Sequence, residues 1–115
     1  MISRATEIAI AGLMAFCPTL ALAGLETQNY RYTCERGVEI PVVYVMSAEA
    51  SVAVLSVEGG QFLLYSEAAA TGARYGWPSD GSNYVWLTNG PDATLMWRDG
   101  TTKTETTLLA ACKQN

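Results

Sequence analysis

Carboxylates are the side chains of this 115-residue sequence best suited to acid–base chemistry, because it contains no histidine. Serine and threonine nucleophiles need a neighbouring base, and the sequence signals none. Asp80-Gly81-Ser82-Asn83 has too few ligands for calcium and is typical of a turn. We therefore expect no catalytic residues, no metal site, no cofactor and no enzymatic activity. The spacing of the carboxylates singles out no pair among Glu35, Glu39, Glu49, Glu58, Asp80, Asp92 and Asp99.

Recognition of another molecule is a different kind of chemistry, and the segment from Ala70 to Gly81 indicates it. This segment is polar, glycine-rich and aromatic at once. Gly72 lets a backbone approach a partner closely, and Arg74 and Tyr75 are residue types enriched at binding hot spots. The spacing leaves a second interpretation open, in which this is an ordinary loop whose Tyr75 and Trp77 cover the open end of a barrel.

Short β-strands must position this segment, because apolar and polar residues alternate with a period of two along most of the chain. Every second residue from Val38 to Met46 shares one face, and Pro41 on the other face suggests an edge or a bulge. Ser66–Ala70 is the one segment that could form a helical turn. The pattern predicts an all-β fold, a small antiparallel barrel or sandwich of about seven or eight strands. Turns are expected at Gly59-Gly60, at Asn89–Asp92 and, as a two-residue hairpin, at Asp99-Gly100.

The N-terminal segment has the parts of a secretory signal peptide. Arg4 lies near its start, an uncharged apolar run follows over residues 8–23, and Ala21-Leu22-Ala23 suits a signal peptidase. We expect cleavage after Ala23, which leaves one domain of residues 24–115 and no stable membrane span. Lipid attachment at Cys17 is disfavoured because the bulky Phe16 precedes it, so Cys17 is expected to leave with the signal.

Two cysteines, Cys34 and Cys112, remain near the two ends of the expected domain. In an oxidising compartment they should form a disulfide. A metal site or redox pair does not fit, since each lacks a neighbouring cysteine and the chain has no histidine. The formal net charge of −4 is kept after cleavage, because the signal contains one arginine and one glutamate. Such a domain repels nucleic acid and anionic lipid, and it is drawn to a basic partner.

Several short motifs, taken in order, resemble the MliC/PliC family, which are inhibitors of c-type lysozyme from Gram-negative bacteria. The resemblance extends from Tyr30 to Cys112, and the order of the motifs is more specific than any one of them. The motifs are Tyr32-Thr33-Cys34 with Gly37 and Val43-Tyr44, then Thr71-Gly72-Ala73-Arg74-Tyr75, Trp86, Asn89-Gly90-Pro91-Asp92-Ala93 and the closing Cys112.

The resemblance implies an antiparallel β-barrel of eight strands, located in the periplasm or anchored to the envelope by lipid, and we expect the periplasm. It implies inhibition of c-type lysozyme, a basic protein, by a protruding loop that enters the active-site cleft. Thr71 would hydrogen-bond a catalytic carboxylate, and Asn89 would sit on the neighbouring turn. These two residues replace a serine and a lysine of the family, so one positive charge is lost. The implied lysozyme-binding residues are Thr71, Gly72, Ala73, Arg74, Tyr75, Asn89 and Gly90.

Two further functions stay open at this point. One is an envelope β-barrel that binds a small apolar ligand or a different protein. A large interior cavity would favour that function, whereas an interior filled with side chains would favour the inhibitor. The other is a structural envelope protein without a soluble target.

Overall fold

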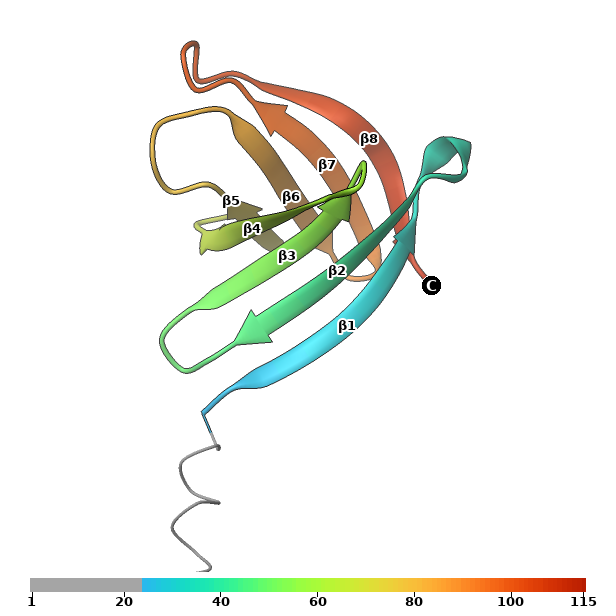
Figure 1. Ribbon diagram of the computed structural model, residues 1–115, viewed down its shortest axis with the longest axis vertical. Coiled ribbons are helices and arrows are strands. Elements are labelled where there is room, and N and C mark those ends of the chain that lie inside the picture. The colour runs from blue at the N-terminus through green and yellow to red at the C-terminus, as the bar shows by residue number, and fades with distance from the viewer. Residues whose placement is uncertain (1–23) are drawn as a thin grey trace, which may run out of the picture.

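The computed structural model describes residues 24–115, whose strands form a closed antiparallel β-barrel (Figure 1). The predicted all-β barrel is confirmed, whereas the predicted signal peptide of residues 1–23, with Cys17, lies outside the described residues. Each strand pairs with the next one along the chain, and β1 pairs with β8 to close the ring. The elements are β1 (Glu26–Thr33), the 3-10 helix η1 (Glu35–Gly37), β2 (Glu39–Met46), β3 (Ser51–Val57), β4 (Gly60–Glu67), β5 (Ala73–Gly76), β6 (Asn83–Asn89), β7 (Asp92–Arg98) and β8 (Glu105–Gln114).

Aromatic side chains fill the barrel interior, as the alternating pattern requires. Trp86 is fully buried, and the ring of Tyr32 meets it edge-on with centroids 5.0 Å apart. The indole Nε1 of Trp86 donates a hydrogen bond to the hydroxyl of Tyr44 at 2.9 Å, and the hydroxyls of Tyr44 and Tyr32 are 2.8 Å apart. Burial, followed by the hydrogen bond with Tyr32, raises the pKa of Tyr44. The interior is therefore a packed core whose polar atoms satisfy one another.

Two local predictions at the ends of β4 need correction. Ser66 and the residue after it continue β4 as a strand instead of starting a helical turn, because they pair with Tyr75 and Arg74 of β5. The β3–β4 turn is centred on Glu58 and Gly59, whose φ angles are 50° and 81°, and not on Gly59-Gly60. Gly60 already pairs with Val57, so the ladder extends one residue further toward the turn than predicted.

The predicted two-residue hairpin at Asp99-Gly100 is wrong, since β7 ends at Arg98 and β8 begins only at Glu105. The Asp99 carboxylate accepts the backbone N–H groups of Thr101 and Thr102, at 2.8 and 3.2 Å, which builds a wider loop. A glycine is needed at position 100 because the backbone of Gly81 lies close to it, and not because the chain makes a tight turn there. A Cβ atom there would lie 2.5 Å from the backbone carbon of Gly81.

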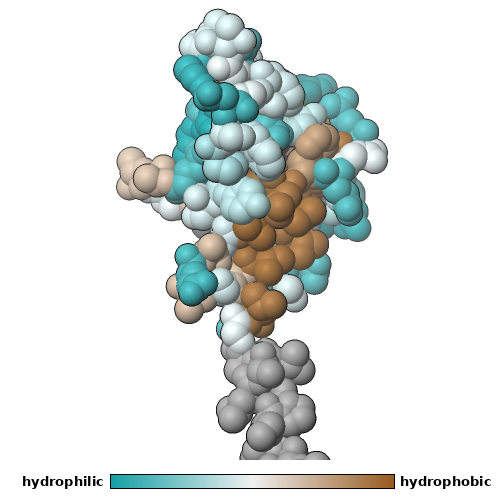
Figure 2. Space-filling model, turned by 60° about the vertical axis from the view of Figure 1, so that its left-hand side comes forward, coloured by the Kyte–Doolittle hydropathy of each residue, from teal (hydrophilic) through white to brown (hydrophobic). Residues whose placement is uncertain are grey.

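The outer wall of β2, β3 and β4 carries an apolar patch. Pro41 faces outward near the beginning of β2, in a stretch whose register pairs are with β1 and not with β3. A residue without a backbone N–H is tolerated at such a position. Figure 2 shows the apolar patch on one face of the barrel. The strand register places these outward side chains next to one another: Val43, Val54 and Leu63 in one row, and Val45, Val52 and Tyr65 in the next.

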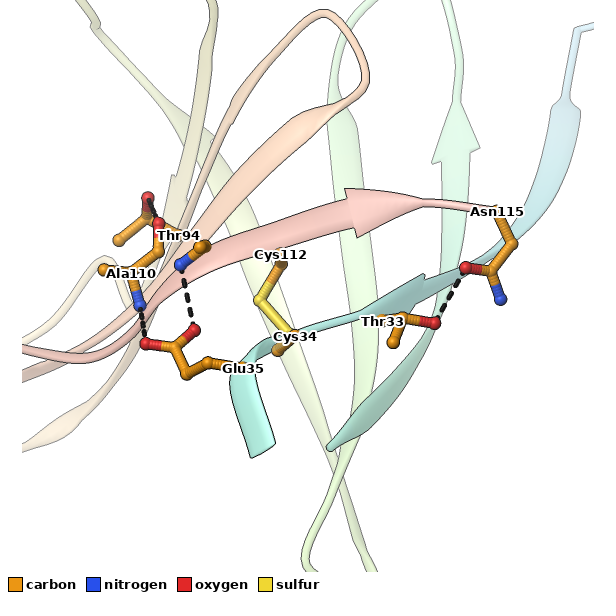
Figure 3. The surroundings of a disulfide bond; sticks show 8 residues. Thr33, Cys34, Glu35, Thr94, Ala110, Cys112 and Asn115 are labelled. Atoms are coloured by element: carbon orange, nitrogen blue, oxygen red, sulfur yellow. Dashed lines mark hydrogen bonds between the residues drawn. A yellow bond between two sulfur atoms is a disulfide. The ribbon is translucent and has the colours of Figure 1, made fainter. Parts of the chain in front are cut away.

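The barrel closes through a short seam that the disulfide reinforces. β1 and β8 share only the register pairs Tyr32↔Gln114 and Thr33↔Lys113. The disulfide Cys34–Cys112 joins the residue after β1 to a residue near the end of β8 (Figure 3). The predicted disulfide is confirmed, and both cysteines belong to the buried core.

Glu35 completes the same junction from the side of η1. The register of β7 with β8 shifts between Ala93↔Cys112 and Leu95↔Leu109, which leaves an extra residue in β8. The two amides at this bulge, of Ala110 and Ala111, both donate to the Glu35 carboxylate at 2.9 Å (Figure 3). These hydrogen bonds lower the pKa of Glu35.

We expect Glu35→Gln to lower the melting temperature at neutral pH. Each carboxylate oxygen of Glu35 accepts one backbone N–H, whereas the side chain of glutamine has one uncharged oxygen that can accept. The folded-state pKa of Glu35 is depressed, so its contribution is present above the unfolded pKa and is lost as pH falls through the folded pKa. The difference between variant and wild type should therefore shrink on acidification. Thermal melts across a pH series measure this, with Glu39→Gln as the control for losing a surface carboxylate. An acid-independent difference would contradict it.

Candidate functional site

The segment around Thr71 connects β4 to β5, and close packing presses it against the end of β6. Gly72 has a φ of +65°, and a Cβ atom on it would lie 2.0 Å from the carbonyl oxygen of Thr88. Only glycine allows both that angle and that approach. The contact brings the loop next to the β6–β7 turn, where Gly90 also has a positive φ, of 61°.

Thr71 and Asn89 are both exposed, and they line the same surface groove of about 460 Å³. The other walls of this groove come from β6, β7 and β8. Each of the two side chains offers a hydrogen-bonding group, and Thr71 comes from the β4–β5 loop whereas Asn89 is the last residue of β6. The structure therefore brings together the two polar residues that the sequence motifs singled out separately.

Lys113 contributes a positive charge to this groove. Asn89 pairs with Asp92 in the β6–β7 ladder, and Asp92 pairs with Lys113 in the β7–β8 ladder, so the three side chains project to the same side of the sheet. The ammonium of Lys113 lies 3.3 Å from the Asp92 carboxylate, and both side chains are more than half exposed. Sequence reasoning missed Lys113 because it lies far from the loop motifs and next to Cys112.

Tyr75 and Ala73 support the loop from inside the barrel. Tyr75 is buried, with its ring centroid 5.6 Å from that of Tyr44, and burial raises the pKa of its hydroxyl. Ala73 is partly buried and packs against the same core. The burial of Tyr75 in the core differs from the exposed position that an anchor for a partner would take.

Arg74 projects outward and is ion-paired within the molecule. Its Nε donates to Glu67 Oε1 at 3.0 Å, and its guanidinium also donates to Glu105. Arg98 binds the same two carboxylates. Hydrogen bonds from Arg98, and then from Arg74, lower the pKa of Glu67 against the opposing effect of burial. The sequence signal for Arg98 and Glu105 is their opposite charges at the two ends of a turn.

Within residues 24–115, no group of three or more histidine, cysteine, aspartate or glutamate side chains is arranged to hold a metal ion. Over the same residues there is no helix with the length and apolar character to cross a membrane.

The described residues form a disulfide-closed barrel that presents exposed polar groups at the Thr71 loop and the neighbouring β6–β7 turn, where another molecule could contact them. Residues 32–104 match the sequence model of the family described as membrane-bound lysozyme-inhibitor of c-type lysozyme. Because the match covers more than half of the sequence, the chain belongs to this family.

One curated relative of the chain carries a matching name. This chain is 37% identical over 70 residues to the membrane-bound lysozyme inhibitor of C-type lysozyme from Cupriavidus necator. The match covers 61% of this chain and 53% of that protein. The chain thus spans about half the length of this curated relative.

Two solved structures are also similar. Pseudomonas aeruginosa MliC in complex with hen egg white lysozyme matches with a TM-score of 0.60 and 28% identity, over 79% of this chain and 84% of that one. PliC, the periplasmic lysozyme inhibitor of C-type lysozyme from Salmonella typhimurium, matches with a TM-score of 0.64 over 78% and 99% of the two chains. Its identity of 21% supports the fold alone.

Proposed function

We propose that this protein inhibits a c-type lysozyme in the periplasm by placing the Thr71 loop and the Asn89–Gly90 turn in the active-site cleft of the enzyme. Residues 1–23 would act as the signal peptide that directs residues 24–115 there. The observation that carries the proposal is that Thr71 and Asn89 are both exposed and line the same groove. Family membership, and a similar chain whose solved structure is a complex with lysozyme, support it.

The chemistry of the target explains how two polar side chains can inhibit it. A lysozyme cleaves its glycan with one protonated carboxylic acid and one carboxylate, which flank the scissile bond. The Thr71 hydroxyl can donate to the carboxylate or accept from the acid, and the Asn89 amide can donate to either. Occupation of both carboxyl groups excludes the glycan and prevents proton transfer.

The net charge of the chain favours the same partner, and Lys113 can supply the positive charge that the family lysine carries and Asn89 lacks. The net charge of −4 favours encounter with a basic enzyme. Arg74 is bound by two carboxylates of its own chain, whereas Lys113 lines the groove with Asn89 and pairs, among the residues that the structure describes, only with the exposed Asp92. Lys113 is therefore the cation positioned to approach an ionised carboxylate of the target.

The packed interior weighs against the alternative of a barrel for a small apolar ligand. Tyr32, Tyr44 and Trp86 occupy the space that such a ligand would need, and they are hydrogen-bonded to one another.

Thr71→Ala and Asn89→Ala should each weaken inhibition about tenfold, because each removes one hydrogen bond to a buried, charged group, worth about 1.5 kcal/mol. The measurement is hydrolysis of bacterial cell walls by a c-type lysozyme, titrated with the purified domain. Thr106→Ala and Asn29→Ala are matched controls, since both residues are exposed on other strands. The controls should inhibit as wild type does.

Absence of inhibition by the wild-type domain at large molar excess would reject the proposed function. Full inhibition by both loop variants would instead reject the assigned residues while keeping the target.

A further inference from the structure

Four charged side chains form an ionic cluster on the outer wall of the barrel. Arg98 binds Glu67 through two parallel hydrogen bonds, at 2.8 and 3.1 Å, and binds Glu105 at 3.0 Å. Arg74 binds the same two carboxylates. Each side chain is 20–25% exposed, and the charges cancel within the cluster. Shared, partly buried pairs of this kind hold geometry better than an isolated surface pair.

The barrel wall is shaped to receive this cluster. Glu67 is on β4 and Arg98 on β7, so their ion pair crosses β5 and β6. A Cβ atom on Gly76 of β5 would lie 2.5 Å from Glu67 Oε2, so glycine makes room for the carboxylate. Val85 of β6 alternates with the inward Tyr84 and Trp86 and so faces outward, yet it is fully buried. A cluster whose carboxylate requires a glycine on the neighbouring strand is a built part of the structure.

The cluster also holds both ends of the Thr71 loop. Glu67 is the last residue of β4, Arg74 is the second residue of β5, and the two are direct register partners. The loop of residues 68–72 runs between them. Arg98 and Glu105 flank the β7–β8 loop in the same way and pair with each other. The residues that flank the loop of residues 68–72 are thereby ion-paired with the residues that flank the β7–β8 loop.

We infer that the ionic cluster is a positioning device for the Thr71 loop, in which Arg98 and Glu105 act through Glu67 and Arg74. It fixes the ends of the loop so that Thr71 lies beside Asn89 before any partner binds. A loop ordered in advance loses less conformational entropy on binding, so affinity rises without a new contact. This inference rests on the proposed function for its effect on inhibition, but its effect on loop order does not.

The test is Arg98→Gln, with two measurements on residues 24–115. In the free domain, NMR order parameters of the backbone amides of residues 68–72 should fall, while those of the β3–β4 turn stay unchanged. The dissociation constant of Arg98→Gln for a c-type lysozyme should be about tenfold higher than that of the wild type. Arg98→Lys keeps the charge but not the paired hydrogen bonds, so its dissociation constant should lie between those two values. Arg31→Gln is the matched control, because it breaks the exposed Arg31–Glu39 pair and should change neither quantity.

Unchanged order parameters in Arg98→Gln would overturn the inference, whatever the inhibition. If the wild-type domain binds no lysozyme, the proposed function fails while the order parameters still decide on positioning. Glu105→Gln carries the same test should Arg98→Gln unfold, because it leaves the bonds of Glu67 to both arginines in place.

Discussion

Replacing Cys34 and Cys112 together by serine should lower the free energy of unfolding by about 4 kcal/mol. The disulfide spans 78 positions, and the chain-entropy model assigns about that value to a loop of this length. Small domains have a net stability of about 5–15 kcal/mol, so the variant should be close to unfolding at 37 °C. Chemical denaturation of the two proteins, followed by tryptophan fluorescence, measures the difference.

The position of this disulfide is the reason for expecting nearly its full effect. β1 and β8 have two register pairs, and two further hydrogen bonds hold the seam: the Asn115 amide donates to the Arg31 carbonyl, and the Thr33 hydroxyl donates to the Asn115 side-chain oxygen. Hydrogen exchange should therefore rise first at Tyr32 and Lys113 in the variant. The double alanine variant is the control, since it removes the cross-link without burying a hydroxyl. A loss below about 1 kcal/mol in both variants would show that the seam holds without its covalent bond.

Gly72→Ala should be the most damaging single substitution near the site. The methyl group would have to occupy space 2.0 Å from the Thr88 carbonyl oxygen, at a φ of +65° that alanine disfavours. The loop must then move away from β6, which separates Thr71 from Asn89. We expect a loss of about 2–4 kcal/mol in stability and inhibition at least tenfold weaker. Urea denaturation and the cell-wall assay measure the two effects.

Gly59→Ala is the matched control for backbone strain. Gly59 has a similar φ of +81° and lies in the β3–β4 turn, and no neighbouring atom lies within 4 Å of the place that a methyl group would take. It should cost about 1 kcal/mol and leave inhibition unchanged. Equal losses for the two glycines would mean that the φ angle alone, and not the contact with Thr88, makes Gly72 necessary.

The residues that the sequence placed well are those whose position depends on neighbours in the chain. Alternation placed Ile40, Val42 and Tyr44 on the inner face of β2, and these side chains are buried. The number of cysteines in the expected domain gave the disulfide. The Asn89–Asp92 turn also lies where its glycine and proline predicted it.

The features that could not be predicted depend on register between strands far apart in the sequence. Nothing in the chain pattern joins Glu67 to Arg98, because their contact needs the twist and spacing of two intervening strands. The sequence suggests a two-residue turn at Asp99-Gly100 because of the glycine. The shape of the loop depends instead on the Asp99 carboxylate, which accepts a backbone hydrogen bond from Thr101. The direction of Arg74 and Tyr75, which decides what each does for the loop, follows from the β5 pairing.

The order of the strands has a consequence for the speed of folding. Among residues 24–115, every strand pair joins neighbours along the chain except β1 with β8, which joins the two ends of the barrel. Contacts between distant segments form slowly, because closing a long loop costs entropy before the contact repays it. In an oxidised but unfolded chain, Cys34 and Cys112 already hold those ends together. The disulfide therefore makes the one strand pairing between distant segments local, and the barrel of residues 24–115 can refold as a ring of adjacent hairpins.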